Sequence, residues 1–377
     1  MSSICFISTY LNHHNKPICE ALYELTDGHF NYVATSNIGE MRKKMGFSQM
    51  EADYLLDYAN ASDKESIQKV IDSADVVIAG ASEPTSLLRT RLKEGKLTFR
   101  ISERLFKTRS RYLKAPIHWL RCFQTRKAYM LCSSAATARD YNLLGFYKNR
   151  CYKWGYFTEV KPLDPVALWD NKINARLNGN TVNLLWVGRL IDWKHPETAI
   201  KALYRIRESG YSFNYNIIGD GPIAPMLRKL VDDLNMNDCV HFLGAKTTKE
   251  VRQYMEECEI YLFTSNREEG WGAVLNESMS CACAVVANSE IGAVPFLLEN
   301  KKNGLIYSKG SVDSLVNCLL SLMDSENNRK QLGIEAYKSI SKNWTPRRAA
   351  ENLLVLVNSL NNSTQNPIIE GPCSFSK

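Results

Sequence analysis

The sequence predicts an α/β protein made of two consecutive domains, each with a parallel sheet covered by helices. Short apolar segments of strand length alternate with amphipathic helical segments along the chain, which is typical of parallel sheets with crossover helices. The alternation fades between residues 155 and 180, around Pro162 and Pro165, and then restarts. A length of 377 residues also exceeds what one compact core usually organises. These three observations favour two domains over one.

The first half contains five apolar runs that we predict to be strands. They are Ile4 to Ser8, Tyr32 to Thr35, Val76 to Ala79, Leu97 to Ile101 and Tyr129 to Cys132. Helical segments fall between them, the first from about Pro17 to Leu25. We therefore expect residues 1–158 to form the N-terminal domain and residues 159–180, with their prolines and polar run, to form a linker.

The second half repeats this pattern more regularly, and we expect residues 181–344 to form the C-terminal domain. The predicted strands are Val182 to Val187, Asn214 to Ile218, Cys239 to Phe242 and Ile260 to Thr264. The predicted helices between them are Pro196 to Glu208, Ala224 to Leu234 and Thr248 to Glu257.

A last helix is expected over residues 345–360, followed by a flexible tail over residues 361–377. Thr345 is a favourable N-cap and Pro346 a favourable first helical residue, because proline has no N–H to leave unpaired there. The apolar residues Ala349, Leu353, Leu356, Val357 and Leu360 then share one face. The tail has two prolines, a glycine and little apolar periodicity.

Composition narrows the possible environments of the protein. The 11 cysteines are odd in number, have no C-x-x-C spacing, and several lie in apolar runs, which favours buried reduced thiols and a cytoplasmic compartment. The first residues lack the features of a secretory signal, and no apolar run reaches the roughly 18 residues of a membrane span. The formal charge of +7 suggests an anionic partner.

The segment from Glu268 to Glu277, EEGWGAVLNE, is the strongest candidate for chemistry. Gly270 and Gly272 leave backbone N–H groups uncovered before a predicted helix, a position that favours an anionic group such as a phosphate. Glu277 follows Gly270 by seven residues, about two helical turns, so we expect its carboxylate on the side of the glycines, with Glu269 leading into them. Carboxylates beside a phosphate suit the hydroxyls of a sugar and a ribose. A glycine-broken loop before a surface helix is the alternative.

Two other segments follow predicted strands and point to the same sheet edge. Arg189 and Lys194 come after the strand that ends at Val187, where open α/β sheets bind ligands, and are suited to a diphosphate. Gly219 to Pro222 form a turn after the strand that ends at Ile218. Solvated charges and an ordinary turn are the alternatives for these two segments.

Together these segments resemble glycosyltransferases of family four. The resemblance is carried by VGRLIDWKHPETAIKAL, NIIGDGP, VHFLGAKTTKEV and EEGWGAVLNESMSCACAVVANSEIGAVPFLLENKKNGLIY, and it covers about Val182 to Tyr307. Glu269 and Glu277 match the acidic pair of the family. The resemblance implies the GT-B fold, with two facing Rossmann-like domains and a C-terminal helix that packs back on the N-terminal domain.

The resemblance also implies roles for individual residues. Arg189 and Lys194 would hold the donor diphosphate, Glu269 the sugar hydroxyls and Glu277 the ribose, so that Glu269, Arg189 and Lys194 are the predicted catalytic residues. The complete predicted donor site is Gly188, Arg189, Lys194, Gly219, Leu243 by its backbone, Glu269, Gly270, Trp271, Gly272, Ala273 and Glu277. The implied reaction retains the anomeric configuration of a sugar taken from a nucleotide-diphosphate sugar, which we expect to be UDP-linked. We expect no cofactor and no metal. Members often have glycine after the lysine, where this chain has His195.

The N-terminal half resembles members that build polysaccharides on lipid-linked or growing glycan acceptors. His13 and His14 follow the first strand, and Glu103 and Arg104 follow the strand that ends at Ile101, so these four residues are the candidates on the acceptor side. A polar or surface role for the histidines is the alternative, and His118 lies in an apolar run that indicates packing.

Other functions fit the sequence less well. A sugar-nucleotide epimerase on the same scaffold and an inactive pseudo-transferase that scaffolds a partner remain the alternatives. We expect no nucleic-acid partner, because basic residues interleaved with base-stacking aromatics in a known motif are not evident.

Residues 89–127 contain most of the basic excess. They hold eight Arg and five Lys against two acidic residues, a charge of +11, so the rest of the chain sums to −4. Aromatic and aliphatic residues interleave with these charges, a composition suited to an anionic membrane surface. We therefore expect a cytoplasmic protein that is peripheral on the inner face of the cell membrane, with a solvated helical face as the alternative for this segment.

Overall fold

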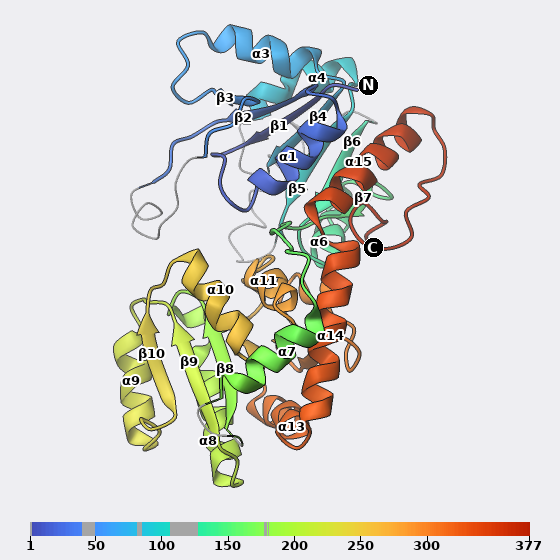
Figure 1. Cartoon of the computed structure of the whole chain (residues 1–377). Helices are drawn as coiled ribbons and strands as arrows, with labels where there is room; N and C mark the ends of the chain where they lie inside the picture. The colour runs from blue at the N-terminus through green and yellow to red at the C-terminus, as the bar shows by residue number, and fades with distance from the viewer. Residues whose placement is uncertain (1, 40–49, 81–84, 106–126, 177–178, 180) are drawn as a thin grey trace. The chain divides into compact units, whose positions relative to one another are not determined.

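The computed structural model describes residues 2–39, 50–80, 85–105, 127–176, 179 and 181–377 (Figure 1). The chain divides into two compact units, one formed by Met1–Glu159 with Asn343–Lys377 and the other by Val160–Lys342. Each unit is built around one wholly parallel sheet. The predicted α/β class with two sheets is confirmed.

The first unit has a seven-stranded sheet in the order β3-β2-β1-β4-β5-β6-β7. Its strands are β1 Ile4–Ser8, β2 Phe30–Ala34, β3 Leu55–Asp57, β4 Val76–Gly80, β5 Thr98–Ser102, β6 Ala128–Cys132 and β7 Cys151–Lys153. Its helices are α1 Lys16–Leu25, α3 Lys64–Ser73, the 3₁₀ turn η1 Thr85–Leu88, α4 Arg89–Glu94, α6 Thr137–Asn142 and α15 Pro346–Asn361. Alternate residues of β1 and β4 pack under α3 in one apolar cluster. The strands β3 and β7, three residues each, are too short to show in the apolar pattern.

The second unit has a six-stranded sheet in the order β10-β9-β8-β11-β12-β13. Its strands are β8 Val182–Val187, β9 Phe213–Ile218, β10 Val240–Gly244, β11 Ile260–Phe263, β12 Ala284–Asn288 and β13 Leu305–Tyr307. Its helices are α7 Pro165–Asn174, the 3₁₀ turn η3 Asp192–Lys194, α8 Pro196–Glu208, α9 Ala224–Asp233, α10 Thr248–Glu257, α11 Val274–Ser280, α12 Val294–Leu297, α13 Val312–Met323 and α14 Glu326–Asn343. One large apolar cluster joins this sheet to α8, α9 and α13.

The strand order of each sheet reverses at one point. In the second unit the order runs outward from β8 to β10 on one side and from β11 to β13 on the other. In the first unit the corresponding neighbours are β1 and β4. Loops that leave such a pair of strands diverge and open a crevice at the carboxyl ends, where α/β proteins bind ligands. The segments after β8 and β11 are therefore neighbours in space.

The last helix begins and packs as predicted. The Thr345 hydroxyl accepts a hydrogen bond from the Arg348 N–H at 3.1 Å, and Pro346 is the first helical residue. α15 packs on α1 (Figure 1), where Arg347 reaches Glu24 at 3.2 Å. The prediction that this helix returns to the N-terminal domain is confirmed.

The predicted flexible tail is wrong for its last residues, which lie along the edge strand β7. The Lys153 N–H donates to the Ser374 carbonyl at 2.8 Å, the Cys373 N–H to the Lys153 carbonyl at 2.7 Å, and the Ser376 N–H to the Cys151 carbonyl at 2.9 Å. Cys373 is fully buried. An edge strand has unpaired backbone N–H and C=O groups, and the tail forms hydrogen bonds with those of β7. Such backbone pairing leaves no apolar periodicity in the sequence, so the pattern did not predict it.

Removing residues 366–377 should therefore destabilise the first unit. Three backbone hydrogen bonds at about 1 kcal/mol each predict a loss of about 2 to 4 kcal/mol in the free energy of unfolding. Urea denaturation followed by circular dichroism measures it, with removal of the exposed Lys377 alone as the control. An unchanged unfolding midpoint after the longer truncation would show that the tail contributes nothing.

The predicted linker over residues 159–180 is also wrong, because most of it belongs to the second unit. α7 places Trp169 and Lys172 in the interior, each with no exposed surface. The Lys172 ammonium donates to the Met255 carbonyl at 2.8 Å and so satisfies the end of α10. The asparagines and prolines around α7 suggested a loop, but Asp164 caps this helix by accepting a hydrogen bond from the Val166 N–H.

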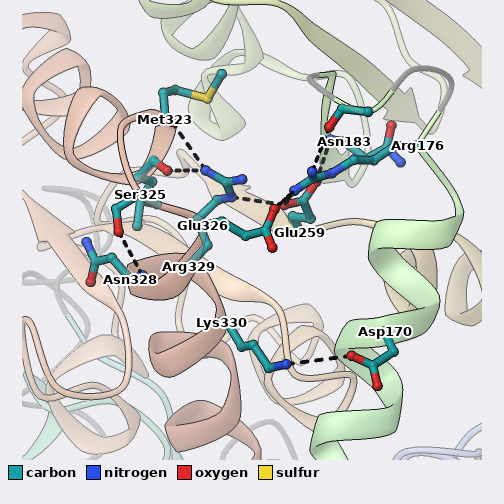
Figure 2. A network of polar contacts seen from close by, with 12 residues as sticks. Asp170, Arg176, Asn183, Glu259, Met323, Ser325, Glu326, Asn328, Arg329 and Lys330 are labelled. Carbon is teal, nitrogen blue, oxygen red and sulfur yellow. Dashed lines mark hydrogen bonds and ion pairs between the residues drawn. The ribbon is translucent and has the colours of Figure 1, made fainter.

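A buried carboxylate ties this segment to the rest of the second unit (Figure 2). Glu259, fully buried before β11, accepts hydrogen bonds from Arg176 at 2.9 and 2.8 Å and from Arg329 at 2.9 Å. Arg329 also donates to the Met323 carbonyl. The two guanidinium groups thus link the residues after α7, the start of β11 and α14 through one anion.

The predicted membrane-facing segment, residues 89–127, is only partly described, since residues 106–126, with Arg109 and Arg111, lie outside the described residues. Within the described part, Phe99 and Arg91 are fully buried and Arg100 is 8% exposed, so these three side chains are not available to a membrane, contrary to the prediction. Arg91 donates hydrogen bonds to carbonyls at the end of α3 and before β5. No helix in the described part of the chain is long and apolar enough to cross a bilayer.

Candidate functional site

The residues after β8 and β11 meet in an ion pair at the carboxyl edge of the second sheet. Lys194 ends η3, Glu269 lies six residues after β11, and the ammonium contacts the Glu269 carboxylate. Only 13% and 11% of these side chains are exposed. The Ser265 hydroxyl donates to the same carboxylate at 3.0 Å. The structure thus brings together two of the three predicted catalytic residues.

Hydrogen bonds from the strands fix the backbone beneath this pair. Trp186 donates to the Thr264 hydroxyl at 2.9 Å, and that hydroxyl donates to the Lys194 carbonyl at 2.8 Å. The Asn266 N–H donates to the Trp193 carbonyl at 3.0 Å. The centre of the Trp193 ring also lies 4.8 Å from the Lys194 ammonium, and the ring stabilises its charge. The lysine is therefore held in place before any ligand arrives.

Arg189 lies beyond the end of β8 and differs from Lys194 in its surroundings. Its side chain is exposed and forms no hydrogen bond or ion pair with any residue that the structure describes. A guanidinium at the edge of a sheet with no internal partner is available to an anion.

Glycines let neighbouring loops approach closely at this edge. A Cβ at Gly219, whose φ is +136°, would lie 1.8 Å from the Gly188 carbonyl oxygen. Because any side chain would collide there, only glycine keeps the ends of β8 and β9 together. Both glycines belong to the predicted donor site, and their observed role is to shape it.

Packing against buried side chains also fixes the turn before α11. Gly272 has a φ of +83°, and a Cβ there would meet the Phe263 ring at 2.3 Å. Trp271 is fully buried, where its indole N–H donates to the Asn276 side chain at 2.8 Å. The Trp271 ring therefore anchors the turn, and its place in the donor site stays a prediction. The N–H groups of Gly270, Gly272 and Ala273 find no hydrogen-bond acceptor within the described part of the chain.

Glu277 lies close to the turn for a different reason than predicted. α11 begins at Val274, so two helical turns do not separate Gly270 from Glu277; the glutamate is in the first turn of the helix. Its carboxylate forms no hydrogen bond with any described residue, and burial raises its pKa to about 7, against the opposing charge of Arg252. Leu243, half-buried in β10, stays a prediction for the base contact.

The acceptor-side candidates lie in the first unit, and three of them gather around Tyr156. The His13 and His14 rings, after β1, are 4.0 Å apart, and the His14 ring is 6.2 Å from Tyr156. The Tyr156 hydroxyl donates to Glu103, after β5, at 3.3 Å. Burial lowers the pKa of His13. Tyr156 was not among the candidates, although it stands in the segment KWGYF; no spacing rule links it to the residues after β1.

Arg104 has a structural partner. Its guanidinium pairs at 3.5 Å with Asp140 of α6, a carboxylate that is 1% exposed. The folded protein needs this arginine to neutralise a buried carboxylate. The surroundings of Arg104 therefore do not support its prediction as an acceptor-side group.

The fold and the site define a two-unit α/β protein of the GT-B kind, with basic side chains at the carboxyl edge of its second sheet. Residues 169–339 match the model of the family described as glycosyl transferases group 1. The match lies within the second unit and covers less than half of the chain.

The curated relatives match only part of the chain. The amylovoran biosynthesis glycosyltransferase AmsK of Erwinia amylovora is 31% identical over 163 residues, which are 41% of this chain and 40% of the relative. An N-acetylgalactosaminyltransferase of Campylobacter jejuni that acts on N-acetylgalactosamine-N,N'-diacetylbacillosaminyl-diphospho-undecaprenol is 29% identical over 182 residues, 48% of this chain and 44% of the relative. The chain thus spans less than half the length of these relatives.

Solved structures match over nearly the whole chain and show the fold alone. Anabaena HepE in complex with UDP has a TM-score of 0.71 at 15% identity, covering 96% of this chain and 100% of that chain. WaaG, a glycosyltransferase involved in lipopolysaccharide biosynthesis, has a TM-score of 0.63 at 14% identity, covering 92% of this chain and 98% of that chain.

Proposed function

We propose that this protein is a retaining glycosyltransferase. It moves a sugar from a nucleotide-diphosphate sugar, UDP-linked, to a hydroxyl of a lipid-linked or growing glycan acceptor in the synthesis of a cell-surface polysaccharide. The observation that carries this proposal is the Lys194–Glu269 pair at the point where the strand order of the second sheet reverses. Arg189, which follows the same strand as Lys194, has no partner among the described residues and adds a second positive charge there.

The charges at this edge suit the departure of a diphosphate. As the bond between the sugar and the diphosphate breaks, negative charge grows on the leaving oxygen, and Lys194 and Arg189 stabilise it electrostatically. The proton of the acceptor hydroxyl passes to the leaving phosphate on the same face of the sugar, so no strong protein base is required. Because Trp193 and Thr264 hold Lys194 before the donor binds, little reorganisation is needed.

The carboxylates suit the neutral parts of the donor. Glu269 accepts from Ser265 and contacts Lys194 through one oxygen, Oε2, which leaves Oε1 as an acceptor for sugar hydroxyls. Glu277, whose carboxylate has no hydrogen bond among the described residues, accepts from the ribose. Neither role requires a metal, and transfer in the presence of EDTA is the expected result.

Two of the matched proteins support the proposed donor and acceptor. UDP, and in a second structure UDP with glucose, are bound by HepE, which supports the donor. The name of the Campylobacter relative includes a diphospho-undecaprenol acceptor, which supports a lipid-linked acceptor. An acceptor of that kind is embedded in a membrane, so the proposed location is the cytoplasmic face of the cell membrane. The cluster of His13, His14, Tyr156 and Glu103 is the proposed acceptor side.

A panel of nucleotide sugars, each with and without a lipid-linked acceptor, tests the function. We expect one donor to be consumed only when acceptor is present, with a glycosylated lipid as the product. A new nucleotide sugar formed without acceptor would instead show an epimerase, and no turnover of any donor would contradict the proposal.

Glu277 makes the proposed donor site sensitive to pH. Its pKa is raised from 4.5 to about 7 in the folded protein, so folding favours the protonated form, and stability falls as the pH rises from about 4.5 through 7. Glutamine does not ionise, so Glu277→Gln removes this loss of stability at high pH. We expect the variant to gain stability over the wild type at pH 8 but not at pH 4, and to bind the donor more weakly at pH 8. Thermal unfolding and donor titration at both values measure this; equal stability at both would contradict it.

A further inference from the structure

His195 has an unusual backbone conformation beside the proposed donor site. Its φ and ψ are +49° and +46°, the left-handed region that favours glycine, and it is the N-cap of α8 without capping it through its side chain. A residue kept in this conformation without being glycine needs a compensating contact. The contacts of its imidazole supply one.

The imidazole joins the segment after β8 to the segment after β11. Its Nδ1 lies 2.8 Å from Oε1 of Glu197 in α8, and its Nε2 lies 3.1 Å from Nδ2 of Asn266. Asn266 Oδ1 accepts a hydrogen bond from the Glu268 N–H at 2.9 Å, and the Asn266 carbonyl accepts one from the Glu269 N–H at 3.1 Å. One side chain thus reaches the first residues of the turn over residues 268–273, which we call the donor turn.

These partners specify the proton on the ring. Glu197 is an acceptor, so Nδ1 carries the hydrogen. The Asn266 amide oxygen is already used by the Glu268 N–H, so its NH₂ group faces the ring and Nε2 must accept. The arrangement therefore holds only for the neutral imidazole protonated at Nδ1.

A second proton on the ring would break this chain of contacts. A protonated Nε2 would face the Asn266 NH₂, donor against donor. Rotating the amide by half a turn would satisfy the ring but take the acceptor from the Glu268 N–H. In the first case the contact between His195 and Asn266 is lost, and in the second the hydrogen bond from the Glu268 N–H is lost.

The charges around the ring favour this second proton. The hydrogen bond to Glu197 raises the pKa of His195, burial opposes it, and Glu290 after β12 and Asp192 of η3 add to the rise. The preceding residue, Lys194, directs its ammonium to Glu269.

We propose that His195 is a positioning residue for the donor turn: in its neutral form it holds the Asn266 side chain, and through it the Glu268 N–H at the start of the turn, and its protonation releases this contact. The inference rests on the proposed function only in taking this turn as the donor site. If the proposal holds, the protein binds the donor more weakly when His195 is protonated in mild acid.

Two variants at this position test the proposal. His195→Gly suits the backbone conformation, so it folds, but it lacks the tether at every pH. His195→Gln offers an oxygen to the Asn266 NH₂ and cannot be protonated. We measure KM and kcat for the donor, between pH 5.5 and 8.5, in the wild type and both variants.

The loss of one hydrogen bond of about 1 to 1.5 kcal/mol predicts a change of roughly fivefold to tenfold in KM. Wild-type KM should rise by this factor as the pH falls, with kcat little changed. The glycine variant should have the high value at pH 8.5, and the glutamine variant should lack this rise, keeping only the change in KM that Glu277 causes in all three proteins. Glu277 titrates in all three proteins, so the difference between their profiles reports His195. Identical profiles would overturn the proposal.

A measurement without donor separates this proposal from the function. Nitrogen-15 NMR of the ring should show a proton on Nδ1 and not Nε2 at pH 8.5, and amide exchange of Glu268 should accelerate in His195→Gly. If no donor is turned over but these results hold, the proposed function fails and the positioning contact stands. A proton on Nε2 at pH 8.5, or unchanged exchange, overturns the contact itself.

Discussion

Replacing Lys194 by alanine should lower the rate of sugar transfer by about 10²- to 10³-fold, the usual effect of removing one group that stabilises developing negative charge. Lys194 is held over Trp193 and beside Glu269, so no other described cation takes the same place. The Ser265 hydroxyl still donates to the Glu269 carboxylate, which keeps the turn folded. Initial rates with the donor found in the panel measure the effect.

A matched control separates this effect from a general loss of positive charge. Lys201, exposed on α8, forms no ion pair with the described residues, and Lys201→Ala should transfer sugar at the wild-type rate. Glu269→Gln keeps the shape of the side chain but removes its charge, so it should also lose transfer. Wild-type rates in Lys194→Ala and Glu269→Gln together would show that the site is assigned wrongly.

The largest expected effect on stability comes from Glu259, far in sequence from the residues that it binds. Glu259→Ala removes the carboxylate that Arg176 and Arg329 share (Figure 2). The arginine side chains are only 7% and 4% exposed, and the carboxylate that they lose is fully buried. Removing one partner of a buried ion pair destabilises by about 3 to 5 kcal/mol. Urea denaturation of the variant, followed by circular dichroism, measures the loss.

Glu326 supplies the control, because it binds the same arginine from the surface. Its carboxylate also lies 2.8 Å from Arg176, but half of its side chain is exposed to water. Glu326→Ala should therefore change the free energy of unfolding by less than about 1 kcal/mol. If the two variants lost equal stability, burial would not be what makes Glu259 important.

Apolar periodicity was sufficient to predict the central strands and the amphipathic helices. β1 and β8 begin and end at the predicted residues, as do α8 and α10, since each has a continuous apolar run or face. Features that depend on partners far along the chain were missed. The tail pairs with β7 through backbone groups, and α7 is fixed by burial of Trp169 and Lys172, so neither is visible in local composition.

The candidate site was predictable to the extent that it follows strand ends. Lys194 and Glu269 each come after a strand, and the strand order that makes those two strands neighbours brings the side chains into contact. The packing of Trp271 under its turn depends on the position of Asn276 and is visible only in the folded unit. Tyr156 likewise joins His14 and Glu103 only through the fold.

Binding of UDP to the purified protein, measured by isothermal titration calorimetry, tests the central claim most directly. We predict one site per chain, binding that is abolished or greatly weakened in Lys194→Ala, and binding at wild-type strength in Lys201→Ala. Undiminished binding in Lys194→Ala, or no binding of UDP, GDP or ADP to the wild type, would contradict a nucleotide-sugar site between the ends of β8 and β11.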